Sequence, residues 1–426
     1  MGAARRAALA AGLVVLLAAC DVTNPGPVQD EFLGDGPSQQ GMVNGAIRKL
    51  AEVLNGRESG VAFTGAIISR ELFPGGNTNY GMSPLVQGGY IEPGSFGNLF
   101  EAGQQARFIA EESLRRFTEK KASNEMLYQA RLYAGYAYRV LGENWCEAVI
   151  DGGANVPGKI YFENAEKHFT EAMTLASTPA KRLAAVAGRA QVRLWLGNYA
   201  GAAADAKEVP TTFRFDIGFD PSDINLQNVV FISNANLPYR TYSVQFTFQK
   251  DYYTQTGDPR AEWATVPGVA FANSSLQGFG QVPWLIQKKY KTPSDVTRLA
   301  GGTDMRLIEA EAALQAGDAA GALALINQVR TSYTSNTTAR KLDPWTGTTV
   351  AEVGTRLKLE RSIELWLEGR HFGDLRRWKD QKTPGTFTLP NYEALTPLFS
   401  TNPRGECFDI PTSERNSNPN VPDLGT

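Results

Sequence analysis

Apolar residues recur every three or four positions over several long stretches of the chain, which is the spacing of amphipathic helices. The stretch 101–142 predicts a helix, a turn and a second helix, with Leu132 and Tyr136 on one apolar face. The same spacing returns in later segments. Together these patterns predict a mainly α-helical fold whose helical hairpins occupy about 101–208 and about 303–380.

Two of the predicted hairpins share one turn pattern. The segments LWLGNYAGAAA and LQAGDAAGALA place Gly197 and Gly317 at equivalent positions 120 residues apart, followed by Asn198 and Asp318. Glycine supplies the left-handed conformation that ends a helix, and the small residues that follow let two helices approach closely. This is the arrangement of tetratricopeptide hairpins. Because the copies do not follow one another at a period of about 34 residues, we expect long insertions between hairpins and no simple solenoid.

Two segments interrupt the helical pattern, at about 73–100 and about 210–300. Both are rich in Gly, Asn, Pro and aromatic residues. Short β-branched runs such as NVVFIS and YSVQFTF suit strands. The two segments are therefore predicted to be long loops with a few short strands, inserted into the helical body.

The chain begins with the pattern of a bacterial lipoprotein signal peptide. A short basic start precedes the apolar run AALAAGLVVLLAA, which is too short to span a bilayer comfortably, and Leu-Ala-Ala leads directly into Cys20. This pattern predicts removal of residues 1–19 and lipidation of Cys20. The alternative is an ordinary secretory signal with an incidental cysteine. Residues 20–40, rich in Pro, Gly and Asp, are predicted to be a tether, and 41–426 the folded body.

Charge and cysteine content narrow the range of partners. Without Arg5 and Arg6 of the signal segment, 40 basic side chains face 44 acidic ones, a net charge of −4. A nearly neutral body argues against nucleic acid as a partner, since phosphate contacts need a concentrated cationic surface. After Cys20 only Cys146 and Cys407 remain. An oxidising compartment permits a disulfide between them, and two buried free thiols are the alternative.

Familiar catalytic motifs are missing from the sequence. It contains no G-x-S-x-G elbow, no P-loop, no H-E-x-x-H and no paired C-x-x-C. His168 and His371 have no neighbouring His or Cys, so no zinc site is predicted. Asp216, Asp220 and Asp223 lack the spacing of an EF-hand calcium loop. We therefore expect a protein that is not an enzyme and that needs no metal or cofactor.

The segment ERSIELWLEGRHFGDLRRWKD has an unusual density of charge. Glu360, Glu364 and Glu368 recur at four-residue intervals along a predicted helix. Like charges at this spacing repel one another, so cations must pair with them. Arg356 and Arg361 lie within reach on the same helix.

Gly369 permits a break after this helix, and a second short helix follows. Arginine pairs with carboxylates in a fixed bidentate geometry, so we interpret the segment as two helical pieces tied by buried or half-buried ion pairs. The functional alternative is a catalytic carboxylate acting with His371. The predicted structural cluster consists of Arg361, Glu364, Glu368, Asp374, Arg376, Arg377 and Trp378.

The segment RLKLERSIELWLEGRHFGDLRRWKD resembles the carboxyl-terminal signature of the RagB/SusD family of outer-membrane nutrient-binding lipoproteins, R-x-x-E-L-x-x-E-G-x-R-x-x-D-L-R-R-W. In one departure, His371 stands where the family often has Arg, and Arg370 stands one place earlier. The segments MRLIEAEAALQAGDAAGALALINQVR and CFDIPTSERNSNPNVPD are also similar to family segments, so the resemblance extends from residue 20 to the end. The matching positions are Arg361, Glu364, Leu365, Glu368, Gly369, Asp374, Leu375, Arg376, Arg377 and Trp378.

The resemblance implies a SusD-like fold of tetratricopeptide-like hairpins in a surface-exposed, lipid-anchored protein of the outer membrane. It also implies a lid on a SusC-like, TonB-dependent transporter, to which glycans or peptides are delivered. Carbohydrate sites combine flat aromatic rings with amides and charged groups. The candidate ligand-binding residues with this mix are Asn77, Asn79, Tyr80, Tyr90, Trp263, Phe271 and Trp284. Two alternatives remain, an envelope scaffold that binds other proteins and an anchored hydrolase.

Overall fold

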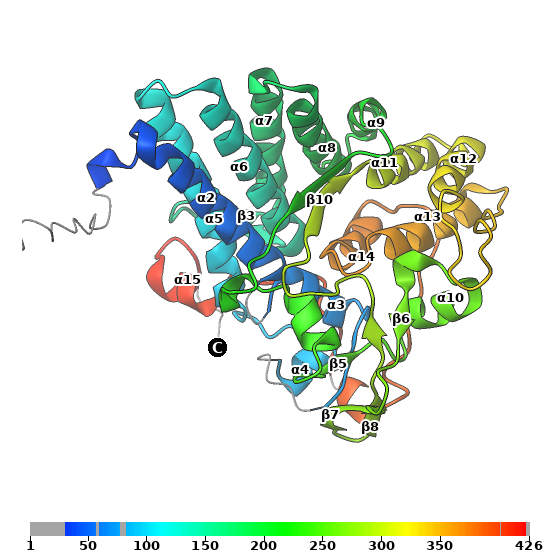
Figure 1. The fold of residues 1–426 in the computed structure, drawn as a ribbon. Coiled ribbons are helices and arrows are strands. Elements are labelled where there is room, and N and C mark those ends of the chain that lie inside the picture. The colour runs from blue at the N-terminus through cyan, green and yellow to red at the C-terminus, as the bar shows by residue number, and fades with distance from the viewer. Residues whose placement is uncertain (1–29, 57–58, 77–81, 401, 423–426) are drawn as a thin grey trace, which may run out of the picture.

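The computed structural model describes residues 30–56, 59–76, 82–400 and 402–422 (Figure 1). Long helices of the first half stand side by side, from blue α2 to green α9. Helix α2 packs beside α5 and α6, and from α5 onward each helix packs against the next. The helices are α2 (Gly36–Asn55), α5 (Gly97–Glu119), α6 (Asn124–Asn144), α7 (Lys159–Leu175), α8 (Pro179–Trp195) and α9 (Tyr199–Glu208).

The second half continues this helical layer. Helix α11 packs against both α9 and α12, which joins the two sets of helices. Helices α13 and α14 follow in orange in Figure 1. These helices are α11 (Gly302–Gln315), α12 (Ala319–Arg330), α13 (Val350–Glu364) and α14 (His371–Asp380). The prediction of a mainly helical fold is therefore confirmed.

The two matching turns have the conformation that their sequences predict. Gly197 and Gly317 have φ values of +72° and +82° between consecutive helices. The side chain of Asn198 then accepts a hydrogen bond from the Gly201 amide at 3.0 Å, and Asp318 does the same for Gly321 at 2.8 Å. Each turn therefore ends one helix and caps the next.

Glycines also set the distance between neighbouring helices. A Cβ atom at Gly135 of α6 would lie 2.7 Å from the ring of Phe169 in α7, and one at Gly188 of α8 would lie 2.4 Å from the same ring. The Phe169 ring thus fills the space that two missing side chains leave, and three helices pack closely around it.

The helical run of the charged segment breaks where the sequence predicts. Helix α13 ends at Glu364 and α14 begins at His371. Between them Gly369 has φ +73°, and a Cβ there would lie 3.2 Å from the backbone of Ala62. Leu367 also has a positive φ, +60°, although it carries a side chain. Its side chain is fully buried, so tertiary packing holds the strained turn in place.

The two predicted insertions contain most of the strands, all short. Strands β5, β7 and β8 lie in the lower part of Figure 1, below the long helices, whereas β10 lies among the helices. The pair β1–β5 joins one insertion to the other, and β10 with β4 links the second to the helices. The antiparallel pairs are β1 (Phe73–Pro74) with β5 (Tyr242–Ser243), β2 (Glu147–Ala148) with β3 (Val156–Pro157), β4 (Arg214–Ile217) with β10 (Thr297–Gly301), β6 (Trp263–Ala264) with β9 (Ile286–Gln287) and β7 (Phe271–Leu276) with β8 (Gly280–Pro283).

Short helices complete the described chain. They are α3 (Val61–Ile68), α4 (Pro84–Gln87), α10 (Phe248–Thr256) and α15 (Thr412–Ser417), with the single turns η1 (Asp30–Phe32), η2 (Ile224–Leu226), η3 (Phe231–Ala235), η4 (Pro259–Ala261) and η5 (Pro397–Ser400). Within the described residues, every helix is too short or too polar to cross a bilayer.

A disulfide joins the end of the α6 segment to the carboxyl-terminal tail. The sequence was compatible either with a disulfide between Cys146 and Cys407 or with two free thiols. The two cysteines are bonded, with Cα atoms 5.6 Å apart. Trp145 and Phe408, the residues next to them, form a β-bridge and pack ring against ring at 5.1 Å. The tail is therefore fixed to the helical layer covalently and by packing.

Candidate functional site

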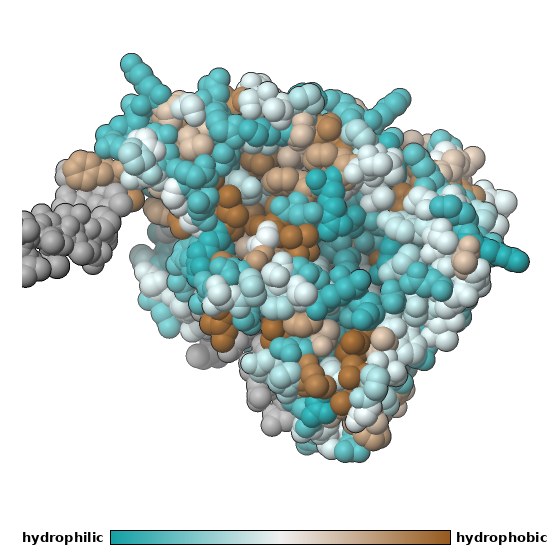
Figure 2. Space-filling model, viewed as in Figure 1, coloured by the Kyte–Doolittle hydropathy of each residue, from teal (hydrophilic) through white to brown (hydrophobic). Residues whose placement is uncertain are grey.

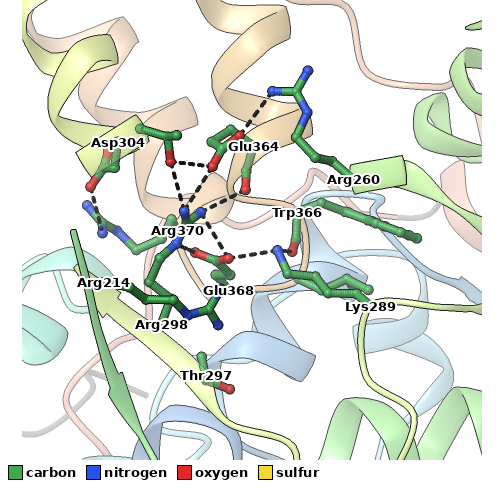
Figure 3. Close-up of polar contacts among 12 residues, drawn as sticks. Arg214, Arg260, Lys289, Thr297, Arg298, Asp304, Glu364, Trp366, Glu368 and Arg370 are labelled. Carbon is green, nitrogen blue, oxygen red and sulfur yellow. Dashed lines mark hydrogen bonds and ion pairs between the residues drawn. The ribbon is translucent and has the colours of Figure 1, made fainter. Parts of the chain in front are cut away.

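The glutamates of α13 and the turn after it pair with cations from the second insertion. Arg298 binds Glu364 at 2.8 Å and Glu368 at 3.0 Å, and Lys289 binds Glu368 at 2.7 Å. Arg260 of η4 lies 3.0 Å from Glu364. Figure 3 shows these three cations converging on the two carboxylates. Because Glu364, Glu368 and Arg298 are buried, water screens the attractions among them weakly.

Glu360, the first glutamate of the row, also pairs with groups from other segments. Its carboxylate accepts from Arg260 at 2.5 Å and from the indole N–H of Trp345 at 2.8 Å. Arg356, which the sequence suggested as a partner on the same helix, instead donates to the Thr346 carbonyl and lies over the Trp345 ring. The cations that balance the glutamate row therefore come from distant segments, which the spacing on α13 could not reveal.

A second group of ion pairs ties α13 to α14 and α11. Arg361 donates to Asp374 at 2.9 Å and pairs with Asp304 of α11 at 3.1 Å. Arg377 binds Asp374 at 2.9 Å and Glu311 of α11 at 2.5 Å. These two guanidiniums are almost fully buried, and each is held by two carboxylates.

Two members of the predicted cluster have other roles. Arg376 donates to the Gly142 carbonyl at 2.8 Å and to Cys146 Sγ at 3.2 Å, and its guanidinium lies 5.1 Å from the Trp195 ring centroid. No carboxylate of the described residues forms a salt bridge with it. Trp378 is buried against the rings of His371 and Phe387. Both residues join α14 to its surroundings, Arg376 through carbonyl and sulfur acceptors and Trp378 through ring packing.

The protonation states suit structural ion pairs. Burial raises the pKa of Glu364, but the attraction of Arg298 and Arg260 outweighs burial and lowers it to about 2. Burial likewise opposes ionisation of Asp374, yet Arg361 and Arg377 hold its pKa below the usual range. Burial lowers the pKa of His371 to about 4, so this imidazole is neutral at pH 7. Among the described residues, no three His, Cys, Asp or Glu side chains gather as a metal site would require.

The structure separates the candidate ligand-binding residues. Cys20 and the candidates Asn77, Asn79 and Tyr80 lie outside the described residues. Tyr90, half-buried, follows α4.

Three further candidates lie in the second insertion. Trp263 is partly exposed in β6, where its indole N–H donates to the Lys250 carbonyl at 3.1 Å. Phe271 in β7 is 42% exposed. Trp284 is only 1% exposed, and its N–H donates to the Asn234 carbonyl at 2.9 Å. It therefore presents no ring face to a ligand, and the expectation for Trp284 is corrected to a role in the core beneath the insertion.

Strand β7 shows why Phe271 faces outward. Ala272 and Leu276 point into the core, whereas Phe271 and Asn273 alternate with them and are exposed. This is the period-two pattern of a strand with one buried face. The core beneath is formed by the rings of Phe73, Trp284, Tyr392 and Phe399.

A turn that the sequence analysis did not select lies next to this strand. The Asn273 amide donates to the Arg240 carbonyl at 3.1 Å, which places the segment 236–240 beside β7. In this turn Leu237 is 51% exposed and Tyr239 is 36% exposed. We call Leu237, Tyr239, Phe271 and Asn273 the hairpin surface. On the face of the molecule drawn in Figure 2, hydrophobic patches lie between polar ones in the lower part.

The hairpin surface also adjoins the start of the segment that holds three candidate residues. Gly75 donates to the Thr241 carbonyl at 2.8 Å. A Cβ at Gly76, where φ is +120°, would lie 2.8 Å from backbone atoms of Ser274 and Ser275. The chain therefore enters residues 77–81 from beside β7. In the sequence, the combination of Pro238 and Tyr239 after two asparagines was the signal that could have indicated an exposed aromatic turn.

Comparison with known proteins identifies the fold. The model of the SusD family matches residues 219–422. No curated protein matches the sequence. A SusD superfamily protein from Bacteroides vulgatus is 17% identical, with 91% of this chain and 98% of that chain covered at a TM-score of 0.64.

Two further solved structures have names that describe ligands. A laminarin binding SusD-like protein is 16% identical over 92% of this chain and 99% of that chain, with a TM-score of 0.65. Surface glycan-binding protein A from Bacteroides uniformis is 14% identical over 90% of this chain and 98% of that chain, with a TM-score of 0.64. At these identities the likeness shows a shared fold, and it confirms the expected SusD-like architecture.

Proposed function

Because the chain belongs to the SusD family, whose model matches residues 219–422, we propose that it captures glycans for nutrient uptake. The observation that carries the proposal is the hairpin surface, where exposed rings lie beside polar groups on a rigidly held insertion. Solved relatives with this fold include proteins named for laminarin and glycan binding. Binding in this proposal is non-covalent and requires no catalytic group.

The chemistry of the hairpin surface suits a sugar. The apolar face of a sugar ring stacks on Phe271 or Tyr239, and its hydroxyls reach Asn273 and the backbone of the neighbouring turn. Trp263 and Tyr90 extend the candidate set on other segments. Asn77, Asn79 and Tyr80, which lie outside the described residues, stay candidate ligand contacts in this proposal. A peptide with aromatic or apolar side chains is the alternative ligand.

The ion-pair cluster supports this surface indirectly. Arg260, Lys289 and Arg298 all belong to the second insertion, and their carboxylate partners belong to α13 and the turn after it. The pairs therefore fix the base of the insertion against the helical layer. A binding surface held in this way loses little conformational entropy when a ligand docks.

The cellular setting of the proposal rests on the amino-terminal pattern and on the family. We propose that Cys20 carries the lipid anchor and that the body lies at the cell surface over a SusC-like, TonB-dependent transporter. Ligand then passes from the hairpin surface to the transporter. Copurification of a barrel transporter with the tagged, membrane-extracted protein tests this partner.

Titration calorimetry with the mature chain tests the glycan proposal. The probes are laminarin, maltoheptaose and polygalacturonate. We expect Phe271→Ala to weaken binding of the preferred glycan about five- to tenfold, the scale of one stacked ring. Phe32→Ala, which removes a ring of similar exposure in η1, is the matched control. Wild-type affinity in Phe271→Ala would exclude the hairpin surface, and absence of binding to every probe would contradict the glycan class.

A further inference from the structure

A separate pocket of about 240 Å³ lies against helix α5. One wall is a face of α5 built from residues three and four positions apart, which a helix places side by side. The other wall is the loop after β2 together with α15 of the carboxyl-terminal tail. The lining residues used below are Glu101, Gln104, Gln105, Phe108, Asp151 and Glu414.

Phe108 gives this pocket an unusual apolar element. Its side chain is 54% exposed, more than any other aromatic residue that the structure describes. An exposed ring of this size gains from any partner that covers it. Phe108 is surrounded in the pocket by carboxylates and amides, a mixture that suits a ligand with one apolar face and polar edges.

The polar groups of the pocket are held in place before any ligand arrives. Gln104 donates to the Val149 carbonyl at 2.9 Å and accepts from Arg107 Nε at 2.9 Å. Arg107, 3% exposed, donates to Asp151 at 2.7 Å. Asp151 has φ +51°, a conformation that a residue with a side chain rarely adopts.

A strained residue beside a cavity, held by a buried guanidinium, is a feature of binding sites. Gln105 donates to Glu101 at 2.8 Å, so these two side chains of the α5 wall are also held in place.

We propose that this pocket is a second carbohydrate site, which takes a single neutral sugar unit. The ring face of the sugar stacks on Phe108, and its hydroxyls donate to the carboxylates of Glu101, Asp151 and Glu414. Three carboxylates face one guanidinium in the lining, so an acidic sugar such as a uronate is repelled. The inference rests on the proposed glycan-binding function and adds a second contact on the same chain, which raises the apparent affinity for long glycans.

Titration calorimetry separates this inference from the function that it rests on. The mature chain is titrated with laminarihexaose, maltohexaose and hexagalacturonate, in the wild type and in Phe108→Ala, Gln105→Ala, Phe271→Ala and the control Phe32→Ala. We expect two neutral hexasaccharides per wild-type chain and one in Phe108→Ala. We also expect the affinity for a long neutral glycan to fall about five- to tenfold in Phe108→Ala, the scale of one stacked ring.

The contrary outcomes are distinct. Wild-type stoichiometry and affinity in both Phe108→Ala and Gln105→Ala would overturn the second site while leaving the function standing if Phe271→Ala still weakens binding. No binding of any glycan to the wild type would overturn both. Hexagalacturonate binding that Phe108→Ala removes would contradict the neutral class. If Phe108→Ala no longer copurifies with a transporter but binds glycans as the wild type does, the pocket would be a contact with a protein and not a sugar site.

Discussion

Glu364→Gln removes one charge from the centre of the ion-pair cluster and keeps the size of the side chain. The carboxylate of Glu364 accepts from Arg298 at 2.8 Å, from Thr303 at 2.5 Å and pairs with Arg260 at 3.0 Å. All three partners remain in the variant. The positive charges of Arg298 and Arg260 then face one carboxylate fewer in a buried environment, so the variant should be less stable.

The size of the effect follows from the pKa of Glu364. Burial disfavours the charged form, but Arg298 and Arg260 lower the pKa from 4.5 to about 2 in the folded protein. That shift corresponds to about 3 kcal/mol of the free energy of unfolding. Breaking a buried ion pair by removal of one partner costs about 3–5 kcal/mol in general. The lower end applies here, since Arg298 keeps Glu368 and Arg260 keeps Glu360.

The sign of the pH dependence is also fixed. A carboxyl group whose folded pKa is depressed contributes its full stability above the unfolded pKa of 4.5 and loses it as the pH falls toward 2. Urea unfolding of the wild type and of Glu364→Gln, followed by tryptophan fluorescence, should therefore differ by about 3 kcal/mol at pH 7. The difference should shrink steadily below pH 4.5.

The matched control is Glu163→Gln, which breaks the exposed pair with Lys159 at 2.9 Å. This change should alter the free energy of unfolding by less than about 0.5 kcal/mol. If Glu364→Gln changes stability no more than Glu163→Gln at pH 7, or if its effect does not depend on pH, the ion-pair reasoning is refuted.

Two further predictions concern packing and the disulfide. Cys407→Ser opens a covalent link to Cys146 across 261 residues, so the free energy of unfolding should fall by up to about 5 kcal/mol, and reductant should reproduce the loss in the wild type only. Gly188→Ala forces a methyl group against Phe169 and should lower the free energy of unfolding by about 1–3 kcal/mol. Gly36→Ala is the control, because a methyl group there meets open space and should not lower stability. Equal melting temperatures of the two variants would contradict the packing account.

The helical hairpins could be predicted because their signals are local. The three-and-four spacing of apolar residues follows from the helix itself. Each turn needs a residue in the left-handed conformation and a capping side chain. The sequence places the two next to each other, as Gly197 with Asn198 and Gly317 with Asp318. The break near Gly369 was predicted for the same reason.

The partners of the glutamate row could not be predicted. The repulsion between Glu360, Glu364 and Glu368 correctly indicated that cations were needed. Spacing along one helix suggested Arg356, whereas the structure pairs the row with Arg260 and other cations of the second insertion. Which distant cation reaches a helix depends on how an insertion folds back, and composition does not specify this.

The exposure of the aromatic residues in the loops could not be predicted from the sequence either. Trp284 and Phe271 stand in similar Gly-rich surroundings in the sequence, yet one is 1% exposed and the other 42%. The difference arises because side chains of β7 alternate between the core and the surface, which exposes Phe271. The indole N–H of Trp284 instead donates to a carbonyl inside the core. Tyr239 was missed because the turn that exposes it becomes adjacent to β7 only in the folded protein.

A crystal structure of the mature protein with its preferred neutral oligosaccharide bound would test the central claim most directly. The account predicts a sugar ring stacked on Phe271 or Tyr239 at the hairpin surface, with Glu364 still bonded to Arg298 beneath it. A glycan seated around Glu364, Glu368 and Asp374 in an opened cleft, with these carboxylates released from their guanidiniums, would contradict it.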